Sequence, residues 1–316
     1  MGLVNTVKQH WKEAALTLAL LGSGIASVDA KTQEIDQLNP TAPTEKTSET
    51  NPNKVNKHAL LFCADSYKDF QIVDSAVGGG TKNTYLISIA NIYNSLREQG
   101  FKAENIDLVY FDGKPDFTEK KDSDLIAKLK DEKGTEIASE IATKESLIEK
   151  INKLKNETQN RDEIFVYMTG HGTKDYAKGD IYFEISPTEE WGMYERIYPE
   201  ELVQLLKQIP SENVDAVLDF CYSGKLGAEL AKQGIDAYTA TDSTTFSMRS
   251  RDSQFGRDLM NAKINLEADS DKNGTISYEE AFAFSEAKRL PSLEKHKEAG
   301  HYAKLKMQPG QIYKAK

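Results

Sequence analysis

The sequence has few cysteines, no long apolar run and no long run of basic residues. Cys63 and Cys221 are its only two cysteines among 316 residues, so a disulfide scaffold is excluded. The formal net charge of −10 argues against nucleic acid or an anionic membrane as the main partner. The remaining composition, 39% hydrophobic and 28% charged, is typical of a globular protein with a full core.

Several catalytic motifs are also missing. No Cys-x-x-Cys redox pair and no Gly-x-Ser-x-Gly elbow occurs. The run Gly78-Gly79-Gly80 lacks phosphate-loop spacing, and a tyrosine-phosphatase loop would need arginine where Gly227 stands. These absences exclude the corresponding chemistries, and we expect no organic cofactor.

The first thirty residues resemble a targeting segment. Two lysines precede the apolar run 14–21, which is too short to span a bilayer, and Val28-Asp29-Ala30 supplies small residues for cleavage. We therefore predict a signal peptide at 1–30 and a secreted or periplasmic protein. The alternative is an uncleaved membrane anchor. The polar stretch 31–56 is predicted to be a flexible linker.

From residue 57 the pattern alternates between apolar strands and amphipathic helices. This order predicts an α/β fold with a mainly parallel sheet and helices on both faces. Residues 65–82 are expected to form a mobile loop and 112–139 an exposed, charged insertion. The expected strands are 59–63, 106–111, 164–168, 214–220 and 235–240, and the expected helices are 85–96, 147–154, 199–208 and 226–232.

Two of the expected strands end in residues that can carry chemistry. The run Ile164–Met168 leads into Gly170-His171-Gly172, and the run Val214–Phe220 leads into Cys221. Functional sites of parallel sheets gather at the carboxyl ends of the strands. We therefore predict that His171 and Cys221 meet there as a catalytic dyad.

The dyad has a defined chemistry. A thiol attacks as a thiolate, and imidazole is a suitable base because its ordinary pKa is near neutrality. Glycines on both sides of His171 let the backbone turn and approach a substrate. The backbone N–H groups of Gly172 and Cys221 are the expected oxyanion donors.

The stretches Tyr167–Gly172 and Leu218–Gly224 resemble the His-Gly and Asp/Glu-x-Cys-x-Ser-Gly motifs of the caspase–legumain clan of cysteine peptidases. The helix and strand within 83–112 and the segment 237–241 resemble the legumain family most, which includes the glycosylphosphatidylinositol transamidase catalytic subunit. The resemblance implies a three-layer α/β/α sandwich over residues 57–250 and acyl transfer through a thioester.

The resemblance also implies roles for two acids. A group that orients the histidine follows the first strand of such enzymes, where Asp65 or Ser66 stands here. An acid two residues before the cysteine shapes the substrate pocket, and here it is Asp219. We expect Asp65 and Asp219 on the substrate side, where Asp219 would favour a basic residue. Alternatively, Asp219 only bonds backbone. A basic preference would make Lys120-Lys121 a self-cleavage site.

A twelve-residue stretch after the predicted catalytic domain matches an EF-hand loop. Gly274 provides its sharp turn and Ile276 its apolar plug. The alternative is a polar turn without metal. We predict one Ca²⁺ site that braces a helical extension over 251–316. The expected oxygen ligands are Asp269, Asp271, Asn273, the Thr275 carbonyl, Ser277 and Glu280.

These features predict a cysteine endopeptidase that binds Ca²⁺ and acts on protein or peptide substrates. Contact with a membrane is expected only through an uncleaved N-terminal segment. Two alternatives remain open at this stage. One is a transamidase that uses the same dyad, and the other is a non-catalytic, Ca²⁺-dependent binding protein.

Overall fold

The structure is a computed structural model that describes residues 55–65, 84–114, 129–185, 194–247, 254–298 and 309–315. The predicted signal peptide, nearly all of the linker, the triple glycine and Lys120-Lys121 lie outside these ranges. Residues Pro52–Lys316 form one compact unit. Among the described residues, no helix has the length and apolar character needed to cross a membrane.

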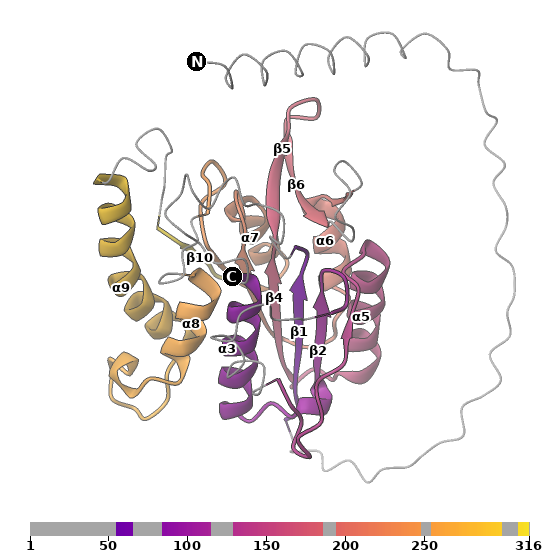
Figure 1. Cartoon of the computed structure of the whole chain (residues 1–316), viewed down its shortest axis with the longest axis vertical. Coiled ribbons are helices and arrows are strands. Elements are labelled where there is room, and N and C mark those ends of the chain that lie inside the picture. The colour runs from indigo at the N-terminus through magenta and orange to yellow at the C-terminus, as the bar shows by residue number, and fades with distance from the viewer. Residues whose placement is uncertain are drawn as a thin grey trace, which may run out of the picture. The chain divides into compact units, whose positions relative to one another are not determined.

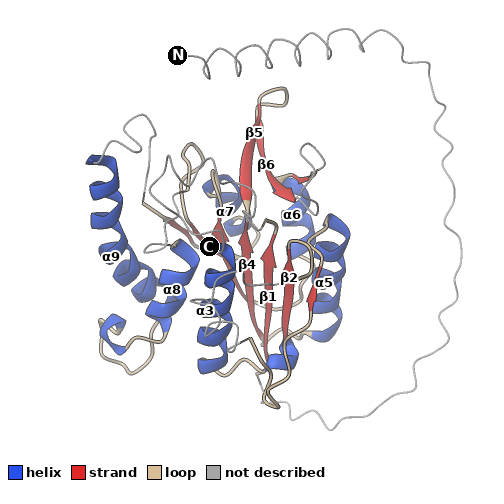
Figure 2. Cartoon of the chain, viewed as in Figure 1, coloured by secondary structure: helices blue, strands red, loops and turns tan. Residues whose placement is uncertain are grey.

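A seven-stranded sheet forms the centre of this unit, in the order β10-β9-β8-β4-β1-β2-β3 (Figure 2). Neighbouring strands are parallel except for β10, which runs antiparallel to β9. The strands are β1 (Lys57–Cys63), β2 (Ile106–Tyr110), β3 (Ser139–Glu140), β4 (Glu163–Thr169), β8 (Asn213–Asp219), β9 (Asp236–Thr239) and β10 (Gln311–Tyr313).

Helices cover both faces of the sheet, which confirms the predicted three-layer α/β/α sandwich. Successive strand residues point to opposite faces, so Leu61 and Tyr167 enter one core and Phe62 and Val166 the other. The first core includes residues of α3 (Thr84–Glu98), α8 (Phe255–Lys263) and α9 (Tyr278–Glu298). The second includes residues of α5 (Lys144–Glu157), α6 (Pro199–Leu206) and α7 (Gly224–Ala231).

A smaller antiparallel sheet continues directly from the end of β4. It consists of β5 (His171–Asp175), β6 (Asp180–Ile185) and β7 (Glu195–Ile197), in that order. Figure 1 shows β5 and β6 extending beyond the end of β4 as a hairpin. Gly170 is the only residue between β4 and β5, so the histidine stands where one sheet passes into the other.

The C-terminal part of the chain belongs to the same compact unit as the predicted catalytic domain. Helix α8 packs against α3 on one face of the sheet, and β10 returns after α9 to form the sheet edge. The described end of the charged insertion is mostly exposed, as expected, but it also contributes to the fold. Leu129 is 4% exposed and belongs to the first core, while β3 pairs with β2. Strands β3 and β10 were not predicted from the sequence.

Candidate active site

The register of three adjacent strands aligns Asp65, His171 and Cys221. The last paired residues of these strands are Cys63 with Thr169, and Thr169 with Asp219. Each of the three site residues follows its strand's last paired residue by two positions. Because neighbouring strands lie about 4.8 Å apart, this register brings an acid, a histidine and a cysteine to one edge of the sheet.

The histidine makes a direct contact with the acid. Nε2 of His171 lies 2.9 Å from Oδ2 of Asp65, and both side chains are partly buried. The pairing of β1 with β4 continues as far as Ala64, whose N–H donates to the Thr169 carbonyl at 2.8 Å. Asp65 is thereby held at the position of a group that orients the histidine. A proton on Nε2 that is donated to Asp65 leaves Nδ1 of the neutral ring unprotonated.

The backbone after the histidine lies against the backbone of the cysteine. A Cβ atom placed on Gly172 would be 1.8 Å from the carbonyl oxygen of Cys221 and 2.9 Å from Cδ2 of Phe220. No side chain fits at this position. The glycine that follows the histidine therefore allows the two strand ends to touch, and His171 adjoins the residue that contacts the Cys221 backbone. The catalytic pairing of His171 with Cys221 stays a prediction.

The cysteine sulfur is contacted by a segment that follows β9. The N–H of Ser247 donates to Sγ of Cys221 at 3.3 Å. The next residue after the cysteine, Tyr222, has a φ of 61° and donates its N–H to the Thr245 carbonyl at 2.9 Å. Both cysteines are thiols, and Cys63 is fully buried with its Sγ donating to the Asp65 carbonyl at 3.1 Å.

Asp219 is the last residue of β8, two positions before the cysteine, and it has no exposed surface. Its Oδ2 accepts hydrogen bonds from the Tyr167 hydroxyl and from the Gly256 N–H, each at 3.1 Å. Tyr167 is on β4 and Gly256 is on α8. The Asp219 carboxylate therefore links β8 to β4 and to α8. These contacts match the interpretation in which Asp219 bonds groups of the protein itself. A role in substrate binding stays a prediction.

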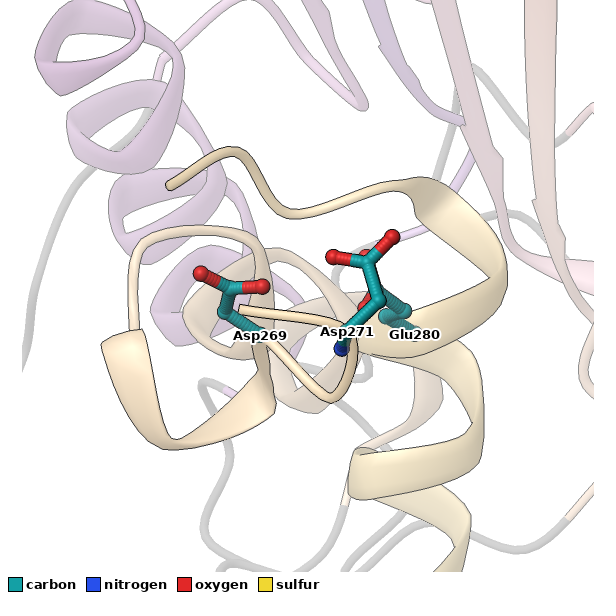
Figure 3. A group of neighbouring side chains, drawn as sticks. All are labelled: Asp269, Asp271 and Glu280. Atoms are coloured by element: carbon teal, nitrogen blue, oxygen red, sulfur yellow. The ribbon is translucent and has the colours of Figure 1, made fainter. Parts of the chain in front are cut away.

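The predicted calcium loop lies between α8 and α9, on the first-core side of the sheet. Oxygens of Asp269, Asp271 and Glu280 gather within 4.8 Å of one another (Figure 3). Gly274 has the φ of 85° that the sharp turn requires, a conformation open to glycine at little cost. The loop backbone is therefore folded around its carboxylates.

The donors of this loop suit a hard divalent cation. Oε1 and Oε2 of Glu280 accept hydrogen bonds from the N–H groups of Ser270 and Ser277, each at 2.9 Å. Those bonds and the serine hydroxyls lower the pKa of Glu280 to about 2, so its carboxylate is charged at any ordinary pH. Oxygen donors with two or three negative charges are the ligands that Ca²⁺ prefers.

Two parts of the site were not predicted from the sequence. Ser247 contributes a backbone N–H, which any residue except proline has, so its residue type gave no indication. Gly256 contributes through close packing, since an added Cβ would lie 2.3 Å from the Tyr167 ring. A glycine at the second position of a helix was the one available indication of that approach.

One family model matches the part of the chain that contains the site. Residues 113–228 match the family model described as the metacaspase, peptidase C14 domain, and that region contains both His171 and Cys221. The match supports the caspase-like superfamily of cysteine peptidases and a cysteine peptidase activity. No curated protein matches the sequence significantly.

One solved structure, protein GSU0716 from Geobacter sulfurreducens, is similar at 14% identity. The alignment covers 82% of this chain and 93% of that one, with a TM-score of 0.44. This likeness is too weak to carry a conclusion about the chain.

Proposed function

We propose that the protein is a cysteine endopeptidase in which Cys221 is the nucleophile and His171 is the general base. The observation that carries the proposal is the shared row of Asp65, His171 and Cys221 on three parallel strands. Asp65 fixes one ring nitrogen of His171, and the other accepts the thiol proton. The thiolate attacks the peptide carbonyl, and the histidine returns the proton to the leaving amine.

The close approach of Gly172 to Cys221 supports a further part of this mechanism. The backbone N–H groups of these two residues are the proposed donors to the oxyanion that forms during attack. Water then attacks the thioester, with His171 again as the base, and the sulfur leaves as a thiolate. The resemblance to legumain and the preference for a basic residue stay predictions.

Labelling with an electrophilic peptide probe tests the nucleophile. Cys221→Ala is expected to abolish both labelling and peptide hydrolysis. Cys63→Ala is the matched control, because Cys63 is fully buried and lies outside the dyad, and it is expected to keep both. Hydrolysis that persists in Cys221→Ala would disprove the proposal. Product analysis with added amines distinguishes hydrolysis from amide transfer to an amine.

We also propose that the 269–280 loop binds one Ca²⁺ ion and braces α8 against α9. The ligands would be Asp269, Asp271, Asn273, the Thr275 carbonyl, Ser277 and Glu280. The gathered carboxylates and the folded loop support this role. Bound Ca²⁺ would neutralise three clustered carboxylates and hold the two helices together.

Thermal unfolding with and without Ca²⁺ tests this site. We expect Ca²⁺ to raise the Tm of the unmodified chain and to have little effect on Glu280→Gln. Glu267→Gln is the control, since Glu267 is an exposed acid of the same segment with only a 3.8 Å ion pair to Lys288. An equal response from Glu280→Gln would contradict the proposal.

The pattern of residues 1–30 supports secretion or export to a periplasm. We propose that this segment is removed during export. N-terminal sequencing of the exported protein would test it, with a first residue near 31 expected. Retention of the segment would instead favour an N-terminal membrane anchor.

A further inference from the structure

The segment between Asp242 and Ser247 forms a short arch over the nucleophile. At its end, the Ser247 N–H points to Sγ of Cys221 over 3.3 Å. The same sulfur lies 4.0 Å from the Ser247 carbonyl oxygen, the outer limit for a hydrogen bond that involves sulfur. The shorter of the two contacts is therefore the hydrogen bond that the Ser247 N–H donates to the sulfur. A donor at this distance favours the charged sulfur over the neutral thiol.

The arch is held in place by its first residue. Oδ1 of Asp242 accepts hydrogen bonds from the Thr244 N–H at 2.7 Å, and from the Thr244 and Thr245 hydroxyls at 2.9 Å each. Burial alone would raise the pKa of Asp242, but these hydrogen bonds lower it, so the carboxylate stays charged. The result is a turn whose shape is fixed by one side chain.

A second set of contacts attaches the arch to the segment that carries the nucleophile. The Thr245 carbonyl accepts the Tyr222 N–H at 2.9 Å, and the Thr245 side chain is 1% exposed. A Cβ on Gly224 would lie 2.7 Å from the Asp242 backbone, so the start of α7 and the arch are in close contact. The donor at Ser247 is thus positioned relative to Cys221 before any substrate binds.

The groups beside the sulfur are compatible with a negative charge there. Tyr222 packs against Phe246 with ring centroids 5.0 Å apart, and Nζ of Lys174 lies 4.7 Å from the Tyr222 ring centroid. Burial raises the pKa of Tyr222 to about 12, so its hydroxyl does not ionise next to the thiolate. The ammonium group of Lys174 contacts the ring of Tyr222, the residue that follows Cys221.

We infer that the backbone N–H of Ser247 stabilises the thiolate of Cys221, with Asp242 and Thr245 as its positioning residues. The inference rests on the proposed function only in taking Cys221 as the nucleophile. The donor acts twice in the reaction. It stabilises the sulfur after its proton passes to His171, and again when water attacks the thioester, the carbon–sulfur bond breaks and the electron pair returns to Sγ.

The test is the pH dependence of Cys221 alkylation by iodoacetamide, read by mass spectrometry of the peptide that contains Cys221. Ser247→Pro removes the N–H and should reduce the thiolate fraction about tenfold at neutral pH, which moves the alkylation midpoint up by about one pH unit. Ser247→Ala keeps the N–H and should match the unmodified chain. Equal midpoints for the two variants would overturn the inference.

A second variant covers the case in which proline prevents folding. Asp242→Ala removes the acceptor that shapes the arch, and it should raise the alkylation midpoint by less than Ser247→Pro does. Thr241→Ser, in the preceding residue, is the control and should leave the midpoint unchanged. An unchanged midpoint in folded Asp242→Ala overturns the inference as well. Repeating the measurement in His171→Ala separates the donor from the histidine, because the effect of Ser247 should persist there.

Alkylation needs no peptidase activity, so the inference and the proposed function can fail separately. A shifted midpoint in a chain without hydrolysis would support the donor and reject the peptidase. Full hydrolysis with no shift of the alkylation midpoint would support the peptidase and reject the donor.

Discussion

At the scale of single residues, the site depends on a contact between two backbones and on one side-chain contact between His171 and Asp65. Gly172 touches the Cys221 backbone, and Asp65 holds His171 from the opposite side. The ring of His171 is therefore held by Asp65 at Nε2, and its backbone is held by the contact of Gly172 with Cys221. Each of these two constraints can be removed by a single substitution.

Gly172→Ala tests the backbone contact. Its methyl group would lie 1.8 Å from the Cys221 carbonyl oxygen, so one of the two strand ends must move. Displacement of a catalytic group by about 1 Å costs about 100-fold in rate, and we expect at least that loss in kcat/KM. Gly179→Ala is the control, since Gly179 has a φ of 67° but no atom within 4 Å of an added Cβ. It should cost stability and leave the rate unchanged; a similar rate loss in both variants would count against the contact.

Asp65→Asn tests the contact between Asp65 and His171. An amide keeps the size of the side chain but loses the charge that holds Nε2–H of His171. We expect kcat to fall by about tenfold to a hundredfold with KM little changed, because orientation of the base acts on the chemical step. Asp180→Asn, at the far end of the β5–β6 hairpin from His171, is the control and should keep kcat. A loss confined to KM would instead point to the substrate-binding role that the sequence suggested for Asp65.

At the scale of elements, strand register explains why the dyad could be predicted from the sequence. Side chains alternate between the faces of a strand, so a slip by one residue would turn every buried side chain outward. The apolar runs before His171 and Cys221 therefore fix which residues end up in one row. The same rule extends to Asp65, which the sequence alone did not distinguish from Ser66 as the residue at that position.

Other elements gave too little local pattern to be predicted. Strand β10 has three residues, all only partly buried, so its sequence shows no alternation. Its place depends on pairing with β9, more than seventy residues earlier in the chain. The role of α8 is likewise set by distant contacts, namely packing on α3 and the bond from Gly256 to Asp219. Contacts of this kind leave no periodic pattern in the sequence.

The pairing of β8 with β9 places two carboxyl groups side by side and predicts how the free energy of unfolding changes with pH. Asp215 on β8 faces Asp236 on β9, Lys314 after β10, Lys263 on α8 and Glu163 on β4. Burial first, and then Asp236, raises the pKa of Asp215 to about 7. The folded state therefore holds a proton that the unfolded state releases near pH 4. Stability from this group is present below pH 4 and is lost as the pH rises towards 7.

Asp215→Asn tests this statement through urea unfolding at pH 5 and pH 8. The amide stays neutral, so the variant should gain stability over the unmodified chain as the pH rises. The pKa difference corresponds to at most about 4 kcal/mol at pH 8, with a smaller difference at pH 5. A constant difference between the two chains across this range would show that Asp215 does not titrate there.

At the scale of the whole molecule, the last residues of the chain connect both sides of the fold. Gly310 donates its N–H to Glu286 of α9 at 3.0 Å, and Glu286 pairs with the buried Arg289. Tyr313 fills the space next to α7, because a Cβ on Gly224 or Gly227 would lie 2.7 Å from its hydroxyl or its ring. The helix that follows the nucleophile is therefore supported by the C-terminal strand.

Removal of residues 309–316 tests this connection. The truncated chain loses the pairing of β10 with β9, the Tyr313 contacts and a partner of buried Glu286, together on the order of 2–4 kcal/mol. For a unit of this size we expect the Tm to fall by roughly 5–15 °C. The exposed edge of β9 should also promote self-association, which light scattering would detect. Lys314→Met keeps β10 and removes the exposed ion pair with Glu279, the contact with Asp236 and a 3.4 Å hydrogen bond to the Tyr238 hydroxyl, so it should change the Tm much less than the truncation does. Slower alkylation of Cys221 together with a lower Tm would show that the C-terminal strand supports the site. An unchanged Tm and an unchanged alkylation rate in the truncated chain would show that it does not.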